Sequence, residues 1–189
     1  MTAPFAFVGG VLTARECRIL KRVGVAAGWE RATILRGSKV AFDKTVRDAG
    51  VARPGAARTK TTKAVVNKII STARWVSAQA FNVSLKDPEV ALVILRYRTG
   101  GKYKWHIDHG QGPAARREIS VVVQLSSEKQ YRGGGLLFKA QGRIYEAPKL
   151  QGTVVVFPSK KTVHALQPVS SGTRYSAVLW LSAPTRTTR

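Results

Sequence analysis

The segment YKWHIDHG, residues 103–110, contains two of the three histidines of the chain and one of its ten acidic residues. Side chains two positions apart in a β-strand share a face, so we expect His106 and Asp108 to point the same way. The third histidine, His164, lies in another stretch with strand character, and distant strands can lie side by side in a double sheet. The sequence therefore predicts a metal site formed by His106, Asp108 and His164.

Two nitrogen donors and one carboxylate on one face of an octahedron leave the opposite face open, as in non-haem Fe(II) oxygenases. His109 would face away from such a metal in a regular strand, and we leave it out of the ligand set. A His-x-Asp pair also occurs on solvated strands, so Arg174, in an alternating apolar strand after His164, adds support. An inward guanidinium there requires an anion, and the far carboxylate of a dicarboxylate co-substrate would provide one.

Two helices are predicted in the first half of the chain. Thr13 and Glu16 form a capping box, and apolar residues at helical spacing follow until Gly28. A second apolar helical face begins at Thr62 and ends before residues 86–89.

The remaining elements are one short strand, a loop and a β-rich second half. Residues 29–35 alternate like a strand, and residues 36–60, rich in Gly, Ala and Arg, predict a long, mobile, basic loop. Seven further β-branched runs follow, separated by glycine turns: 90–97, 102–108, 118–125, 135–140, 152–157, 162–169 and 174–181. Because no helical segments separate these runs, they favour a sandwich or jelly roll over a parallel sheet.

The chain is strongly basic, with 32 Lys+Arg against 10 Asp+Glu and a formal net charge of +22. The excess is spread over both halves, which indicates a basic surface rather than a basic tail. Such a surface attracts polyanions, including nucleic acid, ribosomes and acidic proteins, although a merely solvated surface explains it equally well.

A length of 189 residues favours a single domain, 1–189. The lone Cys17 cannot form an internal disulfide, and the N-terminal residues lack the features of a signal peptide, so we expect an intracellular, cytoplasmic protein. No apolar run approaches the roughly 18 residues that a membrane span needs. The sequence carries no indication of the oligomeric state.

Several stretches together resemble a known family. ILRYRTGGKYKWHID, RREISVVVQL, RGGGLLF, GTVVVFPS and VHALQPVSSGTRYSAVLW are similar, in order and spacing, to the Fe(II)- and 2-oxoglutarate-dependent dioxygenases of the prolyl 4-hydroxylase-like branch. The resemblance covers most of residues 88–182 and implies an α+β fold. It would be a double-stranded β-helix, or jelly roll, with N-terminal helices packed on its major sheet. Residues 1–87 would then supply helical support and a lid loop.

The resemblance also assigns the reacting groups. His106, Asp108 and His164 match the iron ligands, and Arg174 matches the residue that binds the C5 carboxylate of 2-oxoglutarate. It implies Fe(II), 2-oxoglutarate and O2 as the reacting partners, with ascorbate as a reductant that rescues over-oxidised iron.

Further site residues are implied by position. Tyr97 matches a tyrosine of the co-substrate pocket, whereas Gln124 stands where relatives often carry a tyrosine that reaches the co-substrate carboxylate. Tyr103 and Arg117 match substrate-side residues, and Trp180 falls where relatives keep a tryptophan behind the iron. A core aromatic is an equally good interpretation of Trp180.

The predicted lid loop carries Arg47 and Arg53, which could contact a substrate, although loop arginines are usually only solvated. The first hypothesis is prolyl 4-hydroxylation of a protein or peptide by a procollagen-proline 4-dioxygenase-like enzyme. An acidic or ribosome-associated target would suit the basic surface.

A nucleic-acid oxygenase of the same superfamily is the alternative, favoured by the net charge of +22. Base-demethylating relatives carry a second arginine downstream of the carboxylate-binding one, but here the next arginine after Arg174 is Arg186, beyond the last predicted strand. A β-fold adaptor without chemistry is a third hypothesis, which the four matching site residues disfavour.

Overall fold

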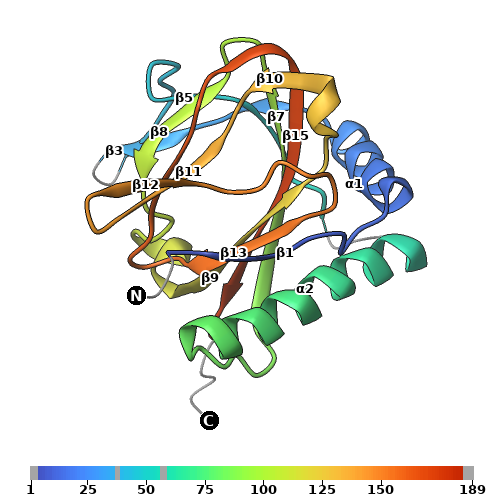
Figure 1. Ribbon diagram of the computed structural model, residues 1–189, viewed down its shortest axis with the longest axis vertical. Coiled ribbons are helices and arrows are strands. Elements are labelled where there is room, and N and C mark those ends of the chain that lie inside the picture. The colour runs from blue at the N-terminus through green and yellow to red at the C-terminus, as the bar shows by residue number, and fades with distance from the viewer. Residues whose placement is uncertain (1–3, 37–38, 56–58, 185–189) are drawn as a thin grey trace.

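The computed structural model describes residues 4–36, 39–55 and 59–184. Two antiparallel sheets face each other, and two helices lie along the outside of the larger one (Figure 1). The larger sheet has the order β1-β13-β9-β15-β7-β6-β2, with β10 also paired to β15. Its strands are β1 Ala6–Val8, β2 Glu30–Arg31, β6 Gly50–Ala52, β7 Glu89–Arg98, β9 Arg117–Gln124, β10 Tyr131–Gly133, β13 Val154–Pro158 and β15 Val169–Ser182.

The smaller sheet has the order β12-β11-β14-β8-β5. Its strands are β5 Arg47–Asp48, β8 Lys102–His106, β11 Leu136–Ala140, β12 Arg143–Glu146 and β14 Val163–Leu166. A separate hairpin joins β3 Ile34–Arg36 to β4 Lys39–Ala41. Short 3-10 turns, η1 Gly112–Arg116 and η2 Glu128–Gln130, flank β9. The predicted jelly roll is thereby confirmed.

The helices cover the larger sheet, as the sequence predicts. The capping box of α1, Ala14–Ala26, is formed as expected, and Cys17 and Leu20 are buried beneath it. Helix α2, Lys60–Phe81, buries one apolar face and ends where Asn82 adopts a left-handed conformation. Both faces join one hydrophobic cluster with the helix side of β7, β9, β13 and β15. Within the described residues, no helix is both long and apolar enough to cross a bilayer.

A second hydrophobic cluster fills the space between the two sheets. Because side chains alternate along a strand, β7 directs Ile94 toward the helices while Val93, Leu95 and Tyr97 face the smaller sheet. From the smaller sheet, β11 contributes Phe138 to this layer, and β14 contributes Leu166. The candidate metal ligands lie at this inter-sheet layer, His106 on β8, His164 on β14 and Asp108 just beyond the end of β8.

The segment predicted as a loop, residues 36–60, is more ordered than its composition indicates. Within its described part, β5 pairs with β8 and β6 pairs with β7, so this segment bridges the edges of both sheets. Residues 37–38 and 56–58 lie outside the described part. The pairing explains the difference, because these short strands are held by their neighbours rather than by their own β-propensity.

Other strand predictions also need correction. The strand predicted over 29–35 is divided into β2 and β3, and the strand predicted to run to Asp108 ends at His106. The short strands β1, β10 and β12 were not predicted.

Candidate metal centre

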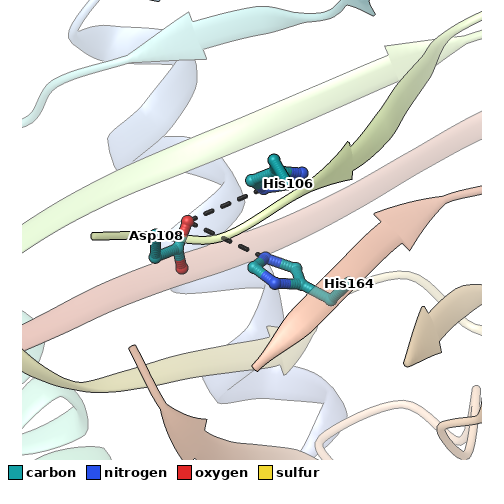
Figure 2. A group of neighbouring side chains, drawn as sticks. All are labelled: His106, Asp108 and His164. Atoms are coloured by element: carbon teal, nitrogen blue, oxygen red, sulfur yellow. Dashed lines mark ion pairs between the residues drawn. The ribbon is translucent and has the colours of Figure 1, made fainter. Parts of the chain in front are cut away.

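The three predicted metal ligands converge on one point (Figure 2). His106 at the end of β8 and His164 on β14 are direct cross-strand partners, which sets their rings side by side. Asp108 lies two residues beyond the end of β8, and its Oδ1 is 3.6 Å from Nε2 of His106 and 3.7 Å from Nε2 of His164. Their ligand atoms all lie within 4.8 Å of one another. This set suits one small cation.

Backbone hydrogen bonds determine which ring nitrogen of each histidine is free. Nδ1 of His106 lies 2.8 Å from the carbonyl oxygen of Lys104, and Nδ1 of His164 lies 3.1 Å from that of Thr162. A carbonyl only accepts, so each Nδ1 must carry the proton and donate it. When the rings are neutral, the lone pair of each therefore remains on Nε2, the nitrogen that faces Asp108. The separations of 3.6 and 3.7 Å between each Nε2 and Asp108 Oδ1 are too long for a hydrogen bond and leave room for a cation shared by the three groups.

The other oxygen of Asp108 is held by two side-chain donors. Ser120 Oγ donates to Oδ2 at 2.7 Å, and Trp180 Nε1 donates to the same atom at 3.0 Å. Arg117 stacks on the Trp180 ring at 3.8 Å and donates to the backbone carbonyl of Asp108 at 3.1 Å. These contacts fix the carboxylate so that Oδ1 alone faces the two histidines.

The electrostatics favour the forms that bind a cation. Burial, and after it the adjacent His164, lowers the pKa of His106 to about 3, so the His106 ring is neutral at pH 7. Burial raises the pKa of Asp108, but the histidines and the hydrogen bonds from Ser120 and Trp180 outweigh it and hold that pKa below its usual value. Neutral imidazoles and an ionised carboxylate fit Fe(II).

Arg174 points inward from β15, as predicted, and only 1% of its surface is exposed. Its Nη2 donates to Gln124 Oε1 at 2.8 Å and its Nη1 to Ser176 Oγ at 3.2 Å, while the buried Nε has no partner. No carboxylate of the described residues forms an ion pair with this guanidinium. A buried cation without a counter-ion fits an anionic ligand, and 2-oxoglutarate would supply the missing carboxylate.

The same inter-sheet cavity is lined by Arg174 and by all three metal ligands. Tyr97 lies opposite Arg174 on the neighbouring strand β7 and also lines this cavity. Gln124 does not line it, because its Nε2 donates to the carbonyl of Pro148 at 3.1 Å and its Oε1 accepts from Arg174. Gln124 therefore orients the guanidinium from behind.

Glycine 134, in the GGG run, makes room for Arg174. Its φ is +60°, and a Cβ there would lie 3.1 Å from Arg174 Cδ. A side chain at this position would press on the aliphatic part of the arginine.

A wider cleft of about 480 Å³ opens beside the metal ligands. Tyr103 stacks on the His106 ring with centroids 3.5 Å apart, and Arg47 lies 4.5 Å over the Tyr103 ring. Arg47, Arg53 and Arg117 all line this cleft. The side chain of Arg53 also pairs with Glu30.

His109, predicted to lie outside the ligand set, lines the cleft and is not part of the ligand group. Ser120 was missed by the sequence reasoning, although a serine inside the apolar run EISVVVQL is an unusual buried position. That polar interruption was the available indication of its contact with Asp108.

Comparisons with known proteins agree with this architecture. Residues 92–182 match the 2OG-Fe(II) oxygenase superfamily. A PKHD-type hydroxylase of Synechococcus sp. (strain CC9605) is 34% identical over 119 residues, which cover 62% of this chain and 53% of the relative. The chain spans about half the length of the first curated relatives it matches.

Solved structures share the fold at low identity. A prolyl-4-hydroxylase of Pseudomonas putida superposes with a TM-score of 0.75 and 20% identity, covering 97% of this chain and 94% of that one. A prolyl hydroxylase of Trichoplax adhaerens, solved with a hypoxia inducible factor peptide, gives a TM-score of 0.76 at 14% identity, covering 95% and 83%. With this fold, the match over residues 92–182 and the two histidines and aspartate brought together within it, this region of the chain belongs to the 2OG-Fe(II) oxygenase superfamily.

Proposed function

We propose that this protein is an Fe(II)- and 2-oxoglutarate-dependent dioxygenase that hydroxylates a prolyl residue of a protein or peptide at C4. The observation that carries the proposal is that the converging residues His106, Asp108 and His164 share one cavity with the guanidinium of Arg174, which has no counter-ion and a buried Nε without a partner. The first three residues would hold Fe(II), and Arg174 would hold the far carboxylate of 2-oxoglutarate. When bound, iron and 2-oxoglutarate supply the oxidation that inserts one oxygen atom of O2 into a C–H bond, with succinate and CO2 as the other products.

The chain itself supplies position and a dry environment. Arg174, oriented by Gln124, fixes the far end of 2-oxoglutarate and thereby the direction in which its keto acid end points. Apolar side chains wall the cavity and limit the access of water, which protects the reaction from side products. These are Leu95, Val122, Leu136, Leu166 and Val178.

An acidic peptide is the substrate class that suits the outer cleft. Three guanidinium groups line it, those of Arg47, Arg53 and Arg117. Among the described residues that line this cleft, the metal ligand Asp108 is the only acidic one. The names of the relatives, as prolyl hydroxylases, support proline as the hydroxylated residue.

The test is succinate release in the presence of Fe(II), 2-oxoglutarate and ascorbate. We expect a proline-containing acidic peptide to stimulate release and to gain 16 Da, while the same peptide with alanine in place of proline does neither. Stimulation by an oligonucleotide instead would indicate that nucleic acid is the substrate, which is the alternative that the net charge of +22 favours.

A matched pair of variants separates catalysis from a binding role without chemistry. His106→Ala removes a predicted ligand, whereas His109→Ala removes a histidine of the same segment that lies outside the ligand group. We expect His106→Ala to lose both Mn(II) binding and turnover, and His109→Ala to keep Mn(II) binding. Equal metal binding and turnover in His106→Ala and the parent would support the adaptor hypothesis.

A further inference from the structure

A row of two adjacent aromatic rings, with a cation at each end, lies on the helix side of the larger sheet. Nζ of Lys21 on α1 lies 5.5 Å over the ring of Tyr175, and that ring lies 6.0 Å from Trp29. The guanidinium of Arg96 then lies 4.4 Å over Trp29. Trp29 and Tyr175 pack against the hydrophobic cluster beneath the helices, whereas the metal ligands line the cavity between the sheets. This row is therefore separate from the candidate active site.

The close packing at one end of the row depends on a glycine. A Cβ at Gly50 would lie 3.3 Å from the Trp29 ring and 3.4 Å from Arg96 Nε. The absence of a side chain there leaves room for the guanidinium beside the indole.

A groove of about 210 Å³ opens where the row ends. Trp29 and Arg96 line it together with Arg31, Arg98 and Phe42. Arg31 lies 5.2 Å over the ring of Phe42, which is 44% exposed. The groove thus offers an accessible aromatic face next to several cations.

Few acidic groups compensate this charge. Two acidic residues line the groove, Glu30 and Asp48, and Glu30 is already paired with Arg53. In the described part of the chain, no carboxylate forms an ion pair with Arg96 or Arg98.

Helix α1 extends the positive surface beyond Lys21. Arg18 and Arg22 are exposed and lie one helical turn apart. Burial lowers the pKa of Lys21, and the nearby charge of Arg18 also lowers it, so these cations are close together. Glu16, the acidic residue of this helix, is held by Thr13 and Lys68. We name the whole surface the basic band; it comprises Arg18, Lys21, Arg22, Arg31, Arg96 and Arg98.

We propose that the basic band binds single-stranded nucleic acid, with phosphates along its cations and a base stacked on Phe42 in the groove. Cations that track a backbone beside accessible rings are the two features such binding requires. A duplex hides its base faces within the stack and could use only the charges. An acidic protein segment would likewise leave the exposed ring without a flat partner. This proposal does not rest on the proposed hydroxylation.

Fluorescence anisotropy with a labelled 12-nucleotide single strand tests it, using Arg96→Glu/Arg98→Glu against Arg143→Glu/Lys161→Glu. The control changes two exposed cations elsewhere on the molecule and lowers the net charge equally. We expect the band variant to bind about tenfold more weakly in 0.1 M salt. Because two phosphate contacts are lost, the magnitude of the slope of log K against log salt concentration should fall by about 1.4. The control should stay within about twofold of the parent. Equal weakening in both variants, or no binding by the parent, would overturn the proposal.

Two further comparisons identify the kind of partner. Phe42→Ala keeps every charge, and we expect it to weaken single-strand binding about fivefold or more. Unchanged affinity in Phe42→Ala would exclude base stacking and overturn the proposal. So would tighter binding of a duplex of the same length, or of a poly-glutamate peptide of equal charge, because each offers charge without accessible bases.

Discussion

The two hydrogen bonds to Asp108 Oδ2 yield the most stringent test of the candidate metal centre. Ser120→Ala removes the donor at 2.7 Å, and Trp180→Phe removes the donor at 3.0 Å while keeping an aromatic ring for Arg117 to stack upon. Without both donors, the carboxylate can rotate and present either oxygen, so Oδ1 is no longer fixed toward His106 and His164. We expect the double variant to fold and to bind metal more weakly.

The size of the effect follows from the role of these donors. Loss of the groups that orient a metal ligand lowers metal affinity by about 10- to 100-fold. That change corresponds to about 1.4 to 2.7 kcal/mol of binding free energy. For a chain of this length, roughly 2 to 4 °C of melting temperature accompany each kcal/mol. At one metal concentration that saturates both proteins, the increase in Tm on adding metal should therefore be smaller in the variant by about 3 to 10 °C.

The assay is thermal unfolding with and without Mn(II), a divalent stand-in that accepts nitrogen and oxygen ligands, together with a direct titration of affinity. Ser126→Ala is the control, because Ser126 is a buried serine that donates to the carbonyl of Thr173 and accepts from the amide of Tyr175, away from the metal ligands. It should lose stability without losing metal affinity. If the Ser120→Ala/Trp180→Phe variant binds Mn(II) within twofold of the parent, the orientation argument is wrong.

Three other predictions address the arginine pocket and the buried thiol. Arg174→Lys replaces the fork of guanidinium donors by a point charge, so calorimetry should show at least about tenfold weaker binding of 2-oxoglutarate with Mn(II) affinity kept. Unchanged affinity for 2-oxoglutarate would show that Arg174 is not part of its site. Gly134→Ala and Gly142→Ala both place alanine at positive φ and should each lose about 1 kcal/mol on urea unfolding, but only Gly134→Ala, whose Cβ would press on Arg174, should also weaken 2-oxoglutarate. Burial raises the pKa of Cys17 from 9.0 to about 11. The contribution of the buried, protonated thiol to the free energy of unfolding is therefore complete below pH 9 and is lost as pH rises toward 11. Relative to Cys17→Ala, the parent should lose about 2 kcal/mol between pH 8 and pH 10.5, and parallel curves would contradict this.

The convergence of the three candidate metal ligands was predictable from the sequence. The residue types indicate the chemistry locally, and the expected strand pairing brings the residues together. His106 and His164 belong to segments that contain aromatic or β-branched residues, so strands were expected there, and the pairing of β8 with β14 brings the two rings together. The end of β8 before Asp108 was not predictable from alternation. It depends on contacts from β9 and β15, whose Arg117, Ser120 and Trp180 hold the aspartate outside the strand.

The segment between the helices was predicted least well, for the same physical reason. Its strands β5 and β6 are two and three residues long, and Gly50 and Asp48 have low strand propensity. They are strands because β8 and β7 offer unpaired edges to them. Alternation within a segment cannot reveal a pairing that its neighbours impose. Arg47 consequently lies over Tyr103 at the cleft, a contact that loop composition could not specify.

The burial of Arg174 connects the stability of the fold to its ligand. A guanidinium that is 1% exposed, bonded only to an amide and a hydroxyl, has lost most of its hydration without gaining a counter-ion. The fold around it must therefore be stabilised by the two hydrophobic clusters on either side of the larger sheet. An anion that reaches this pocket supplies the missing counter-ion, so its binding raises the free energy of unfolding by an amount that grows with the ratio of its concentration to its Kd. The pocket is thus matched to a liganded state, and a dicarboxylate whose other end reaches the metal ligands is the anion that its position favours.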